Sequence, residues 1–127
     1  MSYDLAVWKG DMPSGHREAG KAHCRLYGEY LDGETTTPVE AEIVDLLEVL
    51  ARRWPDRDTG DDTPWASTPL AGGASGPYVY IALAWSSAEA VSRYVSEVAD
   101  RLGLVCFDPQ KGEVRAGMSI SRGTATV

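Results

Sequence analysis

Residues 14–23 contain the arrangement closest to a nucleotide-binding motif. Gly15 and the pair Gly20-Lys21 have the spacing of a phosphate-binding loop. In such a loop, backbone amides at a helix N-terminus surround the phosphates and a final Ser or Thr binds magnesium. Ala22 occupies that final position and cannot bind a metal. We therefore interpret the segment as an ordinary helix that contains two glycines.

Two histidines and a cysteine in the same region are possible metal ligands. His16 and His23 would lie about 10.5 Å apart along a helix, too far to hold one ion together. His23 and Cys24 are neighbours in sequence and would point about 100° apart. The acidic segment 56–63 lacks the closing Glu of a calcium loop. No metal or other cofactor is predicted.

Asp4 and Asp108 are the two carboxylates that a sheet could bring close together. They lie in the first and last predicted strands, which are expected at or near one edge. Acid–base catalysis needs such groups paired in a cleft. We interpret them as polar edge residues and predict no catalytic residue, with an acid–base pair as the alternative.

Composition narrows the class of protein. The chain has 127 residues, which suits one domain, and its 12 Lys and Arg against 19 Asp and Glu give a formal net charge of -7. This balance argues against nucleic acid as a partner, because affinity for the phosphate backbone comes mostly from basic residues. Two cysteines, no signal-like N-terminus and no long apolar run predict a cytoplasmic protein with reduced thiols and no membrane association.

Hydrophobic periodicity predicts three helices and four strands. Three of the strands have clear alternating or continuous apolar patterns, and a shorter one is expected in the hairpin segment before the turn-rich GGASGP. The expected strands are 2–8, a short one within 65–71, 78–85 and 104–108, and the expected helices are 14–31, 38–54 and 87–102. Three N-terminal caps are also expected: Ser14, a capping box at 37–40, and a second capping box of Ser86 and Glu89.

This order of elements matches the βαββαβ plan when the first two helices form one crossover. We therefore predict an α+β, ferredoxin-like fold with a four-stranded antiparallel sheet and all helices packed on one face. Residues 1–108 would form a single domain, and residues 109–127 would be a C-terminal tail or an added hairpin.

In this prediction the second sheet face stays open. It carries Trp8, Tyr78 and Tyr80 beside small alanines, a combination that makes a sticky aromatic surface. RNA-binding sheets use such a face, but this chain lacks the basic surroundings. Cover by the tail, a homodimer interface and a foreign protein partner are equally weighted interpretations of this face.

Four segments of the chain resemble a group of small bacterial proteins whose activities are mostly undescribed. The resemblance covers most of residues 1–110 and rests on an SYDL start, a Trp-Pro after the second helix, a W-S-x-A-E junction and an F-D strand end. The segments are MSYDLAVW, TPVEAEIVDLLEVLARRWPD, PWASTPL and YVYIALAWSSAEAVSRYVSEVADRLGLVCFDPQ. Small acidic proteins of this style are associated with immunity roles in toxin–immunity pairs, an analogy that transfers no residue roles.

The leading hypothesis is a non-enzymatic acidic protein-binding module, such as an immunity protein that neutralises a basic toxin. Acidic side chains would steer it to the partner, and aromatic side chains would anchor it. The predicted partner-binding residues are Trp8, Tyr80, Asp56, Asp58, Asp61 and Asp62. One alternative is a small enzyme or ligand-binding domain with a pocket that uses His16, His23, Asp4 or Asp108. The other alternative is a structural homodimer.

Overall fold

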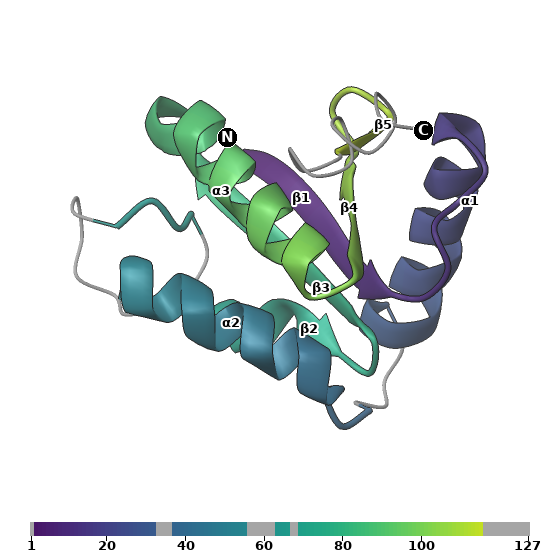
Figure 1. The fold of residues 1–127 in the computed structure, drawn as a ribbon, viewed down its shortest axis with the longest axis horizontal. Helices are drawn as coiled ribbons and strands as arrows, with labels where there is room; N and C mark the ends of the chain where they lie inside the picture. Colours follow the sequence, from purple (N-terminus) through teal and green to yellow (C-terminus); the bar gives the residue numbers. More distant parts are fainter. Residues whose placement is uncertain (1, 33–36, 56–62, 67–68, 116–127) are drawn as a thin grey trace.

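The computed structural model describes residues 2–32, 37–55, 63–66 and 69–115 (Figure 1). The strands are β1 (Ser2–Lys9), β2 (Ala74–Ser75), β3 (Tyr78–Ala84), β4 (Leu104–Asp108) and β5 (Glu113–Arg115). The helices are α1 (His16–Leu26), α2 (Ala41–Arg53) and α3 (Ala88–Arg101). A π-helical turn, Tyr27–Leu31, continues α1, and 3-10 turns cover Leu70–Gly73 and Trp85–Ser87.

The strands form one antiparallel sheet in the order β2-β3-β1-β4-β5. β1 lies in the centre, where Leu5 pairs with Ile81 of β3 and Ala6 pairs with Phe107 of β4. The α+β class and the antiparallel sheet are therefore confirmed. The predicted strand number is wrong, because the sheet has a fifth strand, β5, within the segment predicted as a tail or added hairpin.

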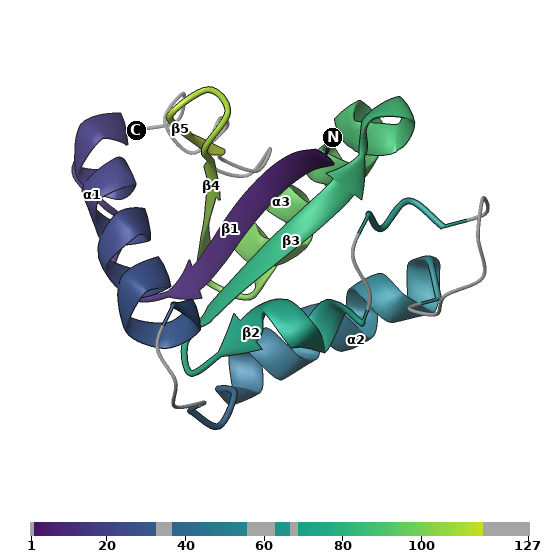
Figure 2. The ribbon, with the colours of Figure 1, turned by 180° about the vertical axis from the view of Figure 1, so that it is seen from behind.

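Helices cover both faces of the sheet, which corrects the prediction that all of them share one face (Figures 1 and 2). α2 and α3 pack on the face that carries Leu5, Val7 and Ile81. α1 packs on the opposite face, where Ala19 and Leu26 join a cluster with Ala6, Trp8, Tyr78, Val105 and Phe107. The cause is in the central strands: β1 and β4 are apolar on both sides, and both sides need cover from water.

The predicted N-terminal caps are also wrong. α2 begins only at Ala41, because the segment before it pairs with the β2–β3 turn. The Glu40 backbone N–H donates to the Gly76 carbonyl at 2.9 Å, and the Gly76 N–H donates to the Thr37 carbonyl at 3.0 Å. α1 has Gly15 at its N-cap without a side-chain hydrogen bond, and the Trp85–Ser87 turn precedes α3, so neither predicted serine cap forms.

The β2–β3 hairpin turns in two residues, Gly76 and Pro77. Gly76 has φ +55°, a value that favours glycine. No helix in the described part of the chain is long and apolar enough to cross a membrane.

Candidate functional site

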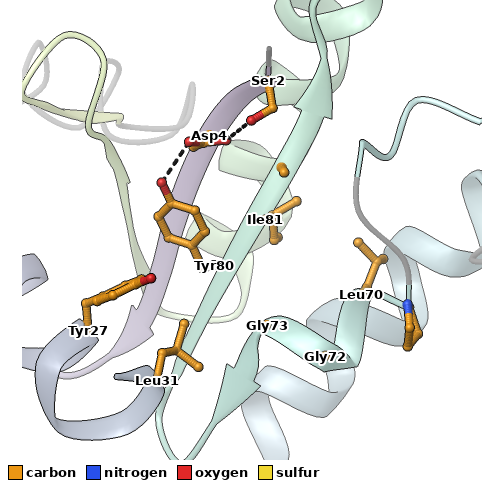
Figure 3. Close-up of a pocket in the computed structure, with 11 residues that line it drawn as sticks. Ser2, Asp4, Tyr27, Leu31, Leu70, Gly72, Gly73, Tyr80 and Ile81 are labelled. Atoms are coloured by element: carbon orange, nitrogen blue, oxygen red, sulfur yellow. Dashed lines mark hydrogen bonds between the residues drawn. The ribbon is translucent and has the colours of Figure 1, made fainter. Parts of the chain in front are cut away.

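A pocket of about 440 Å³ opens on the α1 side of the sheet (Figure 3). Its walls come from β1, β3, the π-helical turn after α1 and the 3-10 turn before β2. The lining residues are Ser2, Asp4, Tyr27, Leu31, Pro69, Leu70, Gly72, Gly73, Tyr80, Ile81 and Ala82. We call it the Asp4 pocket, because Asp4 is the acidic residue in its wall.

Hydrogen bonds fix the Asp4 carboxylate on both of its oxygens. Ser2 Oγ donates to Oδ1 at 2.6 Å, and Tyr80 Oη donates to Oδ2 at 2.7 Å (Figure 3). The backbone of Asp4 is held as well, because its N–H donates to Gln110 Oε1 and its carbonyl accepts from Gln110 Nε2. An acceptor held in this way is pre-organised for a positively charged donor, since little side-chain entropy remains to be lost on binding.

Aromatic rings form the wall next to Asp4. Tyr27 meets Tyr80 edge to face, with ring centroids 5.6 Å apart, and His23 stacks on Tyr80 with centroids 6.1 Å apart. Tyr27 and Tyr80 also line a second hollow of about 360 Å³, shared with His23, Cys24, Gly28 and Asp32. The two hollows therefore share a tyrosine edge and carry one carboxylate each, from Asp4 and Asp32.

Burial shifts the pKa values of His23, Tyr78 and Tyr80 in the direction that favours their neutral forms. It lowers the pKa of His23 below its usual value of 6.5. It also raises the pKa of Tyr78, and together with the hydrogen bond to Asp4 it raises the pKa of Tyr80. His23 Nδ1 and Tyr78 Oη lie 2.9 Å apart and share a hydrogen bond. At neutral pH these two phenols and the imidazole are thus uncharged.

The floor of the Asp4 pocket depends on one glycine. A Cβ atom added at Gly73 would lie 2.3 Å from the carbonyl oxygen of Tyr80, so only glycine lets the Leu70–Gly73 turn approach β3 this closely. The turn then places apolar Leu70 opposite the polar wall.

The two predicted aromatic anchors, Tyr80 and Trp8, differ in their accessibility in the structure. Tyr80 lines both hollows, as described above. Trp8 is only 3% exposed and packs between Tyr78 and Phe107 under α1, so it is not available as a surface anchor. The predicted open aromatic face is therefore wrong, and α1 is the element that covers it. Asp56, Asp58, Asp61 and Asp62 lie outside the described residues.

Asp4 and Asp108 do not form an acid–base pair. Asp4 belongs to the α1 side, whereas Asp108 is fully buried and accepts hydrogen bonds from Tyr3 and Gln110. Tyr3 and Asp4 are successive strand residues and point to opposite faces, which separates their partners. His16 lines neither hollow, and its Nδ1 accepts the backbone N–H of Val114 at 3.0 Å.

Tyr27 and the Leu70–Gly73 turn are site components that the sequence did not indicate. Neither belongs to a motif, and the fold brings them to Asp4 from distant parts of the chain. Among the described residues, no group of three His, Cys, Asp or Glu side chains could hold a metal ion. No protein-family model, curated protein or solved structure matches this chain.

Proposed function

We propose that the protein is a non-enzymatic binding protein that receives a cationic side chain of a basic protein partner in the Asp4 pocket. The observation that carries this proposal is the Asp4 carboxylate, fixed by Ser2 and Tyr80 in the wall of a pocket that exposed Tyr27 and half-buried Tyr80 also line. A Lys or Arg side chain would pair with the carboxylate and lie against the aromatic rings. Cation–π and charge-assisted contacts favour such a side chain over a neutral one.

The net charge of the chain supports this choice of partner. A formal charge of -7 attracts a basic protein over long range and speeds the encounter. Asp56, Asp58, Asp61 and Asp62 keep the partner-binding role that the sequence suggested for them. Tyr80 keeps its proposed anchor role, and Tyr27 replaces Trp8 as the second aromatic contact.

We extend the proposal to the biological setting that the resemblance suggests. The partner would be a basic toxin, and the protein would act as its immunity protein in the bacterial cytoplasm. We also propose that the sheet is a ferredoxin-like βαββαβ arrangement to which β5 is added and in which the first crossover is divided between the two faces. The strand order β2-β3-β1-β4 supports this reading of the topology.

The proposal can be tested by capture of the partner from the native host with tagged variants. Asp4→Asn removes the charge of the pocket and keeps the shape of the side chain. Asp11→Asn removes the same charge from an exposed loop and is the matched control. We expect the wild type and Asp11→Asn to retain one stoichiometric basic protein, and Asp4→Asn to bind it at least about tenfold more weakly by calorimetry, a loss of about 1.4 kcal/mol. Equal affinity of the three proteins for that partner would refute the pocket assignment.

A small organic cation is the second candidate ligand for the same pocket. The volume of about 440 Å³ favours it, because pockets for small ligands typically span roughly 300–1,000 Å³. Benzylammonium is a suitable probe: Asp4-dependent chemical shifts at Tyr27 and Tyr80, without any captured protein, would favour this candidate. The homodimer remains a prediction that light scattering tests, although α1 covers the surface that suggested it.

A further inference from the structure

A second pocket, of about 420 Å³, lies on the opposite side of the sheet, between the start of α3 and the β4–β5 hairpin. It contains three basic side chains, although the chain as a whole is acidic. The lining residues are Tyr3, Trp85, Ala88, Glu89, Ser92, Arg93, Lys111 and Arg115. We call it the Arg115 pocket.

Arg115 is the basic group that the fold positions most firmly. Its Nη1 lies 3.7 Å from Oδ2 of the fully buried Asp108 and donates to Ser92 Oγ at 3.0 Å. The Tyr3 hydroxyl is a third neighbour of this guanidinium group. A guanidinium carries five N–H donors, so the remaining donors can bind an anion in the pocket.

Lys111 and Arg93 bring two further positive charges to the rim. The backbone N–H of Lys111 donates to Asp108 Oδ1, which places this residue in the hairpin turn beside Arg115. Its ammonium group forms no ion pair with any described residue. Among the described residues, Arg93 pairs only with Glu89, at 3.5 Å, and both side chains are mostly exposed. Such a surface pair contributes little and can be exchanged for a stronger anion.

Trp85 gives the pocket an aromatic side. It is 51% exposed and meets Tyr3 edge to face, with ring centroids 5.2 Å apart. An exposed tryptophan beside three basic side chains suits a ligand that is aromatic at one end and anionic at the other.

We propose that the Arg115 pocket binds a phosphate monoester carried by an aromatic group, with the phosphate at Lys111, Arg93 and Arg115 and the ring against Trp85. The three cationic groups outnumber the two carboxylates beside them, Asp108 and Glu89, and a phosphate offers three acceptor oxygens to their N–H donors where a carboxylate offers two. The source is either a free aryl phosphate or a phosphotyrosine side chain, which share this chemistry. The proposal is independent of the Asp4 pocket, which lies on the other face.

Binding of phenyl phosphate can be followed by calorimetry and by tryptophan fluorescence. Lys111→Gln and Arg93→Gln remove exposed charges from the rim of the pocket. Arg101→Gln is the control, because it removes an exposed charge from the C-terminal end of α3, the helix that carries Arg93. We expect roughly tenfold weaker binding for each rim variant and unchanged binding for the control. Glu89→Gln should bind more tightly, since it removes the competing negative charge. Raised salt should weaken binding by the wild type.

Further ligands locate the recognised groups. Benzoate and inorganic phosphate should each bind more weakly than phenyl phosphate, and Trp85→Phe should abolish the fluorescence change. A phosphotyrosyl peptide that binds more tightly than phenyl phosphate would assign the source to a protein. No binding of phenyl phosphate to the wild type, or equal binding by Lys111→Gln and Arg101→Gln, would overturn the proposal.

Discussion

Trp8 and Trp85 offer a direct test of which sheet face is covered. The same substitution, Trp→Ala, removes the same atoms from a residue that is 3% exposed at position 8 and from one that is 51% exposed at position 85. A buried tryptophan removes about 150–250 Å² from water. At about 25 cal/mol per Å² this stabilises folding by about 4–6 kcal/mol.

The unfolded chain already buries part of that area, which lowers the expected loss for Trp8→Ala to about 3–5 kcal/mol. Trp85→Ala loses mainly the edge contact with Tyr3 and should cost about 0.5–1.5 kcal/mol. Urea unfolding followed by circular dichroism measures the free energy of unfolding of each variant. Both variants are analysed with the wild-type dependence of that free energy on urea concentration. If both variants lost about 1 kcal/mol or less, α1 would not cover Trp8 and the two-sided packing would be refuted.

Three further changes test individual parts of the fold. Gly73→Ala should lower the melting temperature and destabilise by about 1–3 kcal/mol, because its Cβ would overlap the carbonyl oxygen of Tyr80. A thiol reagent should modify exposed Cys24 readily and Cys106 only on unfolding, since burial raises the pKa of Cys106 to about 12. Burial lowers the pKa of His23 below its usual value of 6.5. Just below pH 6.5, His23 therefore binds a proton in the unfolded chain but stays neutral in the folded chain. The free energy of unfolding should therefore fall as the pH drops from 7 toward 5, and His23→Gln should reduce that fall in urea titrations at both pH values.

Most of the sheet could be predicted from local sequence patterns. Alternation along β1 and β3, and the apolar run of β4, specify strands by residue type alone. The position of α1 could not be read in this way. The side of α1 that faces the sheet carries mainly small residues. A Cβ atom added at Gly20 would lie 3.7 Å from the ring of Phe107. Small residues allow close approach to aromatic rings but give a weak hydrophobic signal.

The continuous apolar run of β4, LVCF, contained the missing information in the sequence. All five residues of Leu104–Asp108 are buried, and a strand of this kind needs cover on both faces. The run of apolar residues at positions 5–8 of β1 indicates in the same way that Trp8 belongs to the core. What no local pattern shows is the Asp4 pocket, because its tyrosines and its 3-10 turn meet Asp4 only through the topology of the sheet. The sequence did indicate Asp4 as a candidate site residue, but its predicted partner, Asp108, points to the opposite face of the sheet and bonds Tyr3 there.

Two successive residues of β1 line the two proposed sites, one on each face of the sheet. Tyr3 lines the Arg115 pocket and Asp4 lines the pocket named after it, because successive strand residues face opposite sides of the sheet. Gln110 joins them, since its side chain bonds the Asp4 backbone and the Asp108 carboxylate that holds Arg115. Asp4→Asn changes only the side chain and leaves each of these bonds available. It should therefore weaken cation binding without altering the affinity for phenyl phosphate, and the failure of one proposal would not be mistaken for the failure of the other.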